Sequence, residues 1–144
     1  PPSDPDSASG QFGLSLIDAA RAAGLRVPEA SVADPQDRFV EAGKYRFHYL
    51  DWGNEHLPDL LFLHGFAQQA HSWDFASLML RDRFHVVSLD LRGHGDSDWA
   101  EDGRYFLRDY VEDVGLIVHD LGLTHLTVVG YPLFDGLPLF PPLI

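Results

Sequence analysis

Three short runs of almost unbroken apolar residues constrain the fold of this chain more than any other feature. They occupy residues 60–63, 86–89 and 126–129, and read Leu-Leu-Phe-Leu, Val-Val-Ser-Leu and Leu-Thr-Val-Val. Strands buried on both faces read this way, and such strands occur mainly in parallel sheets that are covered by helices. We therefore expect the three runs to form the centre of a parallel sheet.

Helical patterns lie between these runs. Residues 72–80 predict a short helix, and residues 107–121 predict a longer one whose apolar positions form a single stripe, followed by Gly122 as the C-cap. Strand, helix, strand, helix and strand then follow one another along the chain. This order predicts an α/β fold, a three-layer sandwich with a mostly parallel central sheet.

The segment before the first apolar run predicts an N-terminal hairpin. Residues 38–40 and 44–51 read as two strands, and the aromatic and polar residues that alternate along the second indicate a wetter face and an outer position in the sheet. We expect residues 1–37 to form a flexible leader with a short helix at residues 14–23, which Gly24 would cap.

The composition excludes several classes of partner and site. Asp and Glu number 22 against 10 Lys and Arg, a formal charge of −12 that repels nucleic acid and anionic membrane surfaces. The chain has no cysteine and no apolar run near the roughly 20 residues that cross a bilayer. The spacing of the eight histidines matches no metal motif, so we expect no metal site. As a separate expectation, we assign the chain to the cytoplasm.

The loop after the first apolar run reads His64-Gly65-Phe66. A small-residue turn at the end of a strand can point backbone N–H groups into a cleft, as oxyanion holes do. In the alternative interpretation, Gly65 only permits a tight turn and His64 hydrogen-bonds within its own loop. Trp73 begins the next helix, where its ring could line the cleft, although core packing is favoured.

The loop after the second apolar run is the most specific signal in the chain. Its glycines, Gly93 and Gly95, permit the positive φ angles of a loop that folds back over the sheet edge. We expect it to shape the site rather than to react, with its polar side chains engaged in loop hydrogen bonds. The polar residues concerned are Asp90, Arg92, His94 and Ser97.

Together, the two loops resemble the front half of an α/β-hydrolase over residues 38–130. The resemblance implies a partial α/β-hydrolase fold. In the full-length relative it implies hydrolysis of an ester, lactone, carbon–carbon or related bond in a small-molecule substrate, without a cofactor. It also implies that the backbone N–H groups of Phe66 and Leu133 form the oxyanion hole.

The same resemblance places the nucleophile after the third run, in the pattern small-x-nucleophile-x-small, which here falls on Pro132. Proline has neither a nucleophilic atom nor an N–H group. The acid and the histidine that follow the nucleophile in this family have no counterpart among residues 133–144. We therefore expect no catalytic residue in this chain, and a proline-rich irregular tail at residues 131–144.

Two hypotheses follow. In the first, the chain is the N-terminal portion of such a hydrolase, cut short near Gly130 by a shifted reading frame or an alternative ending. In the second, it is a non-catalytic binding or regulatory module that uses the proline-rich end to contact a partner. In either case the run from Leu126 to Val129 becomes an exposed sheet edge, and we expect possible self-association through it.

Overall fold

The apolar runs at residues 60–63 and 86–89 form central strands of a five-stranded sheet, as expected, whereas the run at residues 126–129 forms an edge strand instead of a central one. In the computed structural model, which describes residues 16–27 and 34–131, the strand order is β1-β2-β4-β3-β5. The strands are β1 (Gln36–Ala42), β2 (Tyr45–Asp51), β3 (Asp59–Leu63), β4 (His85–Leu89) and β5 (Thr127–Gly130). Strand β3 pairs in parallel with both β4 and β5, while the β1–β2 hairpin joins β4 in antiparallel orientation.

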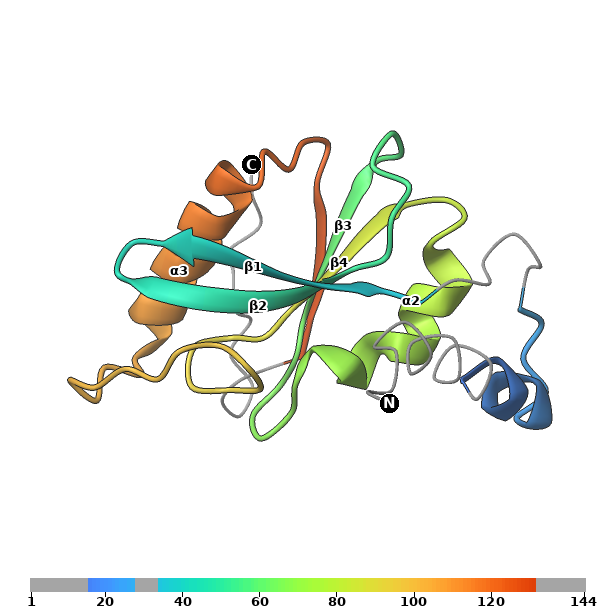
Figure 1. Cartoon of the computed structure of the whole chain (residues 1–144), viewed down its shortest axis with the longest axis horizontal. Coiled ribbons are helices and arrows are strands. Elements are labelled where there is room, and N and C mark those ends of the chain that lie inside the picture. Colours follow the sequence, from blue (N-terminus) through green and yellow to red (C-terminus); the bar gives the residue numbers. More distant parts are fainter. Residues whose placement is uncertain (1–15, 28–33, 132–144) are drawn as a thin grey trace, which may run out of the picture.

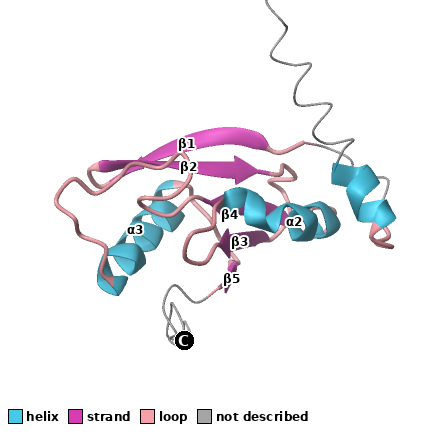
Figure 2. Cartoon of the chain, turned by 90° about the horizontal axis from the view of Figure 1, so that it is seen from below, coloured by secondary structure: helices cyan, strands magenta, loops and turns pink. Residues whose placement is uncertain are grey.

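Helices cover both faces of the central strands, which confirms the three-layer arrangement. Helix α3 (Leu107–Asp120) lies on one side, and η2 (Ala70–Trp73) with α2 (Asp74–Leu80) lies on the other (Figures 1 and 2). Along β3, Leu61 and Leu63 pack in the core cluster of α3, whereas Leu60 and Phe62 pack in the cluster that contains Leu78 of α2. Successive residues of the strand thus enter opposite cores, which explains the unbroken apolar run.

The long helix ends at the expected glycine. Gly122 has a φ of 64°, and Leu123 donates its N–H to the Val118 carbonyl oxygen at 3.1 Å. This is the left-handed cap that glycine adopts without a steric penalty. Residues 16–22 are helical, and Gly24, with a φ of 78°, ends that helix in the same way.

Strand β2 departs from the expectation of an outer, half-wet strand, and that prediction was wrong. It lies between β1 and β4, and every residue from Phe47 to Asp51 is buried. Lys44 and Arg46 are exposed, as the alternation predicted, but the polar residues His48 and Asp51 are buried because other side chains bind them. His48 is 2% exposed and contacts two carboxylates, and Asp51 is 6% exposed and contacts His85.

Strand β5 begins one residue later than expected and lies at the edge of the sheet. Among the described residues it pairs only with β3, and Val129 is 38% exposed. Pro132 and Leu133, with the rest of the expected irregular tail and most of the expected leader, lie outside the described residues. None of the helices in residues 16–27 and 34–131 combines the length and the apolarity needed to span a membrane.

Candidate functional site

The segments that carry the sequence motifs meet at one edge of the sheet. The turn at residues 64–66 follows β3, the loop at residues 90–97 follows β4, and Tyr131 follows β5. In the parallel register Leu63 lies beside both Leu89 and Gly130, and Tyr131 donates its N–H to the Leu63 carbonyl oxygen at 3.1 Å. The carboxyl ends of three parallel strands therefore converge, which is where open α/β sheets place their ligands.

His64 is a fully buried connection between two of these segments. Its Nε2 accepts a hydrogen bond from the Leu91 N–H at 3.0 Å, so its Nδ1 donates to the Gly65 carbonyl oxygen at 2.8 Å. Burial lowers the pKa of His64, and neighbouring His94 adds to the effect. A neutral imidazole with both nitrogens engaged is a structural group here. Phe66 next to it extends into solvent, with 74% of its surface exposed.

Asp90 is the centre of the second loop. Its buried carboxylate accepts hydrogen bonds from the Ala70 N–H at 2.7 Å, the Asp96 N–H at 3.0 Å and His48 Nδ1 at 2.7 Å. Burial alone would raise the pKa of Asp90, but these hydrogen bonds outweigh it and lower the pKa below its ordinary value of 3.8. Gly95 passes so close, at a φ of 49°, that a Cβ atom there would overlap this carboxylate.

Ser97 and His94 form hydrogen bonds within or beside their own loop. The Ser97 hydroxyl donates to the Asp90 carbonyl oxygen at 2.6 Å and accepts from the His48 N–H at 2.8 Å. His94 donates from Nδ1 to the Arg92 carbonyl oxygen at 2.9 Å, and its ring centroid lies 4.8 Å from that of His64. These side chains hold the shape of the loop.

Arg92 anchors the same loop to α3. Its guanidinium forms two hydrogen bonds of 2.7 Å with the Asp113 carboxylate and lies over the Tyr45 ring. The pair is buried, at 7% and 5% side-chain exposure. Gly93 has a φ of 76°, and a Cβ atom there would come within 2.6 Å of the Tyr105 ring. The buried ion pair of Arg92 with Asp113 thus attaches the loop to α3.

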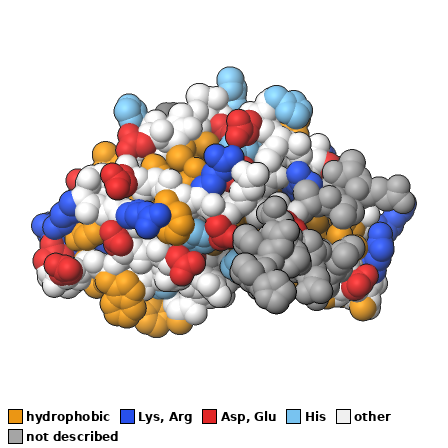
Figure 3. All heavy atoms as spheres, viewed as in Figure 1, with side chains coloured by type: hydrophobic (Ala, Val, Ile, Leu, Met, Phe, Trp, Pro, Cys, Tyr) orange, Lys and Arg blue, Asp and Glu red, His pale blue; other side chains and the backbone are white. Residues whose placement is uncertain are grey.

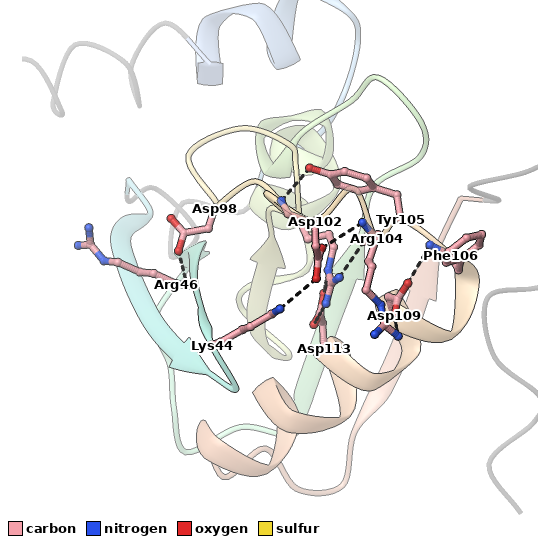
Figure 4. Close-up of polar contacts among 11 residues, drawn as sticks. Lys44, Arg46, Asp98, Asp102, Arg104, Tyr105, Phe106, Asp109 and Asp113 are labelled. Carbon is pink, nitrogen blue, oxygen red and sulfur yellow. Dashed lines mark hydrogen bonds and ion pairs between the residues drawn. The ribbon is translucent and has the colours of Figure 1, made fainter.

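The chain after this loop is held against the hairpin by polar contacts (Figure 4). Lys44 pairs with Asp102 at 3.0 Å, and the Arg46 N–H donates to Asp98 Oδ2 at 2.8 Å. Trp99 between these contacts is 72% exposed. Exposed hydrophobic side chains gather at the lower left of Figure 3, over the region where this segment runs in Figure 1.

Trp73 is half-buried and packs against the core cluster that contains Leu78 of α2. Its ring stacks with those of Phe62 in β3 and Tyr131, at distances of 4.4 and 4.9 Å between the ring centroids. Its buried Nε1 has no hydrogen-bond partner among the described residues. The stack connects the end of β5 to the helix that follows the turn.

The described residues include one close group of potential metal ligands. His48, Asp90 and Asp96 have ligand atoms within 4.8 Å of one another. His48 Nδ1 and Asp90 Oδ2 are, however, already in direct hydrogen bond at 2.7 Å. An ion would have to displace the proton between them, so the geometry favours a hydrogen-bonded network.

A second cluster of polar groups lies at the opposite edge, where β3 and β4 begin. His85 lies between two carboxylates, with Nδ1 at 2.7 Å from Asp59 Oδ1 and Nε2 at 3.1 Å from Asp51 Oδ1. The hydrogen bond to Asp51, with a further one to Asp59, raises the pKa of His85 against the effect of burial. The cluster lines a polar hollow of about 560 Å³, remote from the motif loops.

Sequence reasoning did not single out His48, Asp113 or Tyr131. Asp113 could have been noticed as a carboxylate within the apolar stripe of the long helix, where it is 3% exposed. His48 shows no such local signal, because its main partner Asp90 lies 42 residues away. Tyr131 gains its stacking role only from the pairing of β5 with β3.

Comparisons with known proteins agree with this arrangement. The sequence model of the family described as alpha/beta hydrolase fold matches residues 58–132, about half of the chain. The chain is 33% identical over 111 residues to epoxide hydrolase 4 of Mus musculus, covering 72% of this chain and 31% of that protein. It is also 33% identical over 123 residues to an esterase of Mycobacterium tuberculosis, covering 85% and 38% respectively.

Solved structures show the same likeness. A bacterial membrane phospholipase A superposes with a TM-score of 0.65 at 27% identity, over 83% of this chain and 37% of that one. An epoxide hydrolase from Vigna radiata superposes with a TM-score of 0.60 at 30% identity, over 68% and 32%. The chain thus spans about a third of the length of the relatives that it matches.

Proposed function

Because the chain belongs to the α/β-hydrolase family, we propose that it supplies the N-terminal scaffold and the oxyanion side of a hydrolase. The reaction would cleave an ester, lactone, carbon–carbon or related bond of a small molecule. Ester and epoxide bonds come first, because similar proteins carry the names esterase and epoxide hydrolase. The proposal assigns to the Phe66 N–H the stabilisation of negative charge on the reacting oxygen.

The observation that carries this proposal is the adjacency of two strand ends. The turn with Phe66 follows β3, and Tyr131 follows β5, the parallel neighbour of β3, with Leu63 in register with Gly130. A nucleophile lifted after β5 would therefore lie beside an N–H donor after β3, as acyl transfer requires. This supports a role for the turn at residues 64–66 in binding an oxyanion.

We further propose that the 144-residue polypeptide does not turn over a substrate by itself. The position that the family gives to the nucleophile is Pro132, which offers no attacking oxygen and no proton to transfer. The hydroxyl of Ser97, within the second motif loop, donates to the Asp90 carbonyl oxygen at 2.6 Å. Because its proton goes to a carbonyl oxygen and not to a base, the Ser97 hydroxyl is not an activated nucleophile.

A chimera tests the proposed role of the turn. Residues from 131 onward are replaced by the corresponding segment of the Mycobacterium tuberculosis esterase, chosen to supply the nucleophile, acid and histidine that the family pattern places after this strand. We expect hydrolysis of a nitrophenyl ester by the chimera. In that background Phe66→Pro, which removes the N–H, should lower kcat by about 10²–10³, the effect of losing one oxyanion donor.

Phe66→Ala is the matched control, since it keeps the N–H and removes only a side chain that is 74% exposed. It should leave kcat nearly unchanged. Equal losses in the two variants would show that the turn does not supply the donor. A folded but inactive chimera would favour the alternative of a non-catalytic binding or regulatory module.

A further inference from the structure

The turn that carries Phe66 is held at both ends by two consecutive residues that follow β4. At the start of the turn, His64 Nε2 accepts the Leu91 N–H at 3.0 Å. At its end, the Ala70 N–H donates to Asp90 Oδ1 at 2.7 Å. The position of the Phe66 N–H therefore depends on where Asp90 and Leu91 lie.

Asp90 is in turn held by His48 of β2. Nδ1 of His48 lies 2.7 Å from Asp90 Oδ2, and Nε2 lies 2.7 Å from Asp37 Oδ1 of β1. The side chains of His48 and Asp90 are each 3% exposed. A carboxylate accepts hydrogen bonds and does not donate them, so an imidazole between two carboxylates donates from both nitrogens and is positively charged.

We propose that His48 is a positioning residue for residues 64–70, which begin with the turn at residues 64–66. Its doubly protonated ring fixes Asp90, and loss of one of the two ring protons couples the order of this segment to pH. Once the ring is neutral, only one nitrogen carries a proton for the two carboxylates. Asp37, with 69% of its side chain exposed, can turn to water, whereas buried Asp90 loses its counter-charge. The buried negative charge is then less stable, so Asp90 moves toward water more readily and the hydrogen bond that it accepts from the Ala70 N–H breaks more often.

The charged groups around His48 come from each element packed against it. They are Asp37 on β1, Asp90 and Asp96 after β4, and His71 on η2, which interacts electrostatically with Asp37 and Asp90. The hydrogen bond to Asp90 raises the pKa of His48 above 6.5, while burial opposes this and Asp37 adds to it. A group whose pKa is raised by folding contributes fully to stability at pH values below its pKa in the unfolded chain. That contribution is lost as the pH rises through its pKa in the folded protein.

Folding lowers the pKa of Asp90, so its contribution to stability is present above pH 3.8 and is lost as the pH falls through its lower pKa in the folded protein. The hydrogen bonds by which His48 holds Asp90, and Asp90 holds Ala70, should therefore be fully formed in mildly acidic solution and should weaken as the pH rises above 6.5. This inference extends the proposed function, because it takes the turn to be the oxyanion element. It does not depend on hydrolysis by this chain.

The test is an NMR titration of the full chain that follows the ring of His48 and the backbone amides of Phe66 and Ala70. We expect all three to titrate with one midpoint above 6.5, and amide-exchange protection of Ala70, corrected for the intrinsic rate, to fall above it. A ring midpoint at or below 6.5, or amide signals that stay flat through the ring titration, would overturn the proposal. These readings need no variant.

Variants separate positioning from a merely structural role. His48→Gln should abolish the amide titration and leave Ala70 with the weaker protection of the wild type at high pH. Asp37→Asn, a surface change, should lower the ring midpoint and keep the amides coupled to it. His85→Gln is the matched control, because it removes an equally clamped histidine at the other edge and should leave the amides of the turn unaffected.

His71 needs its own control, since it adjoins Ala70 and its hydrogen bond to Asp74 raises its pKa. His71→Gln should keep the titration of the Ala70 amide at the wild-type midpoint. Loss of that titration in His71→Gln, with its retention in His48→Gln, would assign the effect to His71 and overturn the proposal. A failure of the proposed function in the chimera would leave these NMR results unchanged, so the two outcomes are distinguishable.

Discussion

Gly95→Ala gives the sharpest test of the role assigned to Asp90. Gly95 has a φ of 49°, and a Cβ atom there would overlap the Asp90 carboxylate. That carboxylate is buried and accepts hydrogen bonds from Ala70, Asp96 and His48, so it cannot move without giving up at least one of them. Gly103 is the matched control, because it has a φ of 70° and nothing within 4 Å of its would-be Cβ.

The two substitutions share one cost and differ in another. A left-handed φ costs alanine about 1–2 kcal/mol relative to glycine, and Gly103→Ala should destabilise the fold by about that amount. Gly95→Ala adds the loss of one hydrogen bond to a buried charge, worth about 1.5–3 kcal/mol, for a total of about 2.5–5 kcal/mol. A single domain is stable by about 5–15 kcal/mol, so the larger effect is readily measured.

The assay is equilibrium unfolding in urea, followed by tryptophan fluorescence and by far-ultraviolet circular dichroism. Gly95→Ala should shift the midpoint well below that of Gly103→Ala, with the same slope. Equal free-energy losses in the two variants would refute the reasoning. They would show that the Asp90 carboxylate can move aside freely and is not the fixed centre of the loop.

Three further predictions concern stability and association. Two carboxylate partners raise the pKa of His85, so the contribution of its charge to the free energy of unfolding is complete below pH 6.5 and is lost as pH rises. In urea unfolding, the difference in stability between wild type and His85→Gln should therefore shrink from about pH 6 to about pH 9, and a difference that grows would contradict this. Asp113→Ala should lower the free energy of unfolding by about 3–5 kcal/mol because it leaves buried Arg92 without its carboxylate, whereas the double variant Arg92→Met/Asp113→Leu should lose less. A double variant as destabilised as the sum of Arg92→Met and Asp113→Leu measured singly would argue against coupling of the two side chains. We propose self-association through the edge strand β5, so in sedimentation velocity the sedimentation coefficient should increase with protein concentration, and Val129→Lys should suppress the increase. A wild type that stays monomeric at all concentrations would speak against it.

Local sequence patterns predicted the parts of the fold that depend on local physics. The apolar runs at residues 60–63 and 86–89 marked central strands because residues such as Leu61 and Phe62 enter opposite cores. Gly122 marked the end of the long helix because the cap needs a left-handed φ. Both features are set within a few residues of the chain, so periodicity and residue type are enough to find them.

The candidate site was predictable as a set of loops but not as a network. His48 was expected on a wet face, and its burial follows from Asp90, which lies 42 residues later. The stack of Trp73 with Tyr131 likewise forms only once β5 lies beside β3. Such contacts depend on strand order, which no local alternation encodes.

We propose that this chain carries the oxyanion side of a hydrolase without an attacking group at residue 132. Intact-protein mass spectrometry after incubation with a fluorophosphonate probe and with a nitrophenyl ester tests it most directly, because either reagent leaves a covalent adduct on an activated nucleophile. We predict an unmodified mass and release of nitrophenol at the background rate. A stoichiometric adduct that maps to one side chain, together with turnover, would contradict the claim.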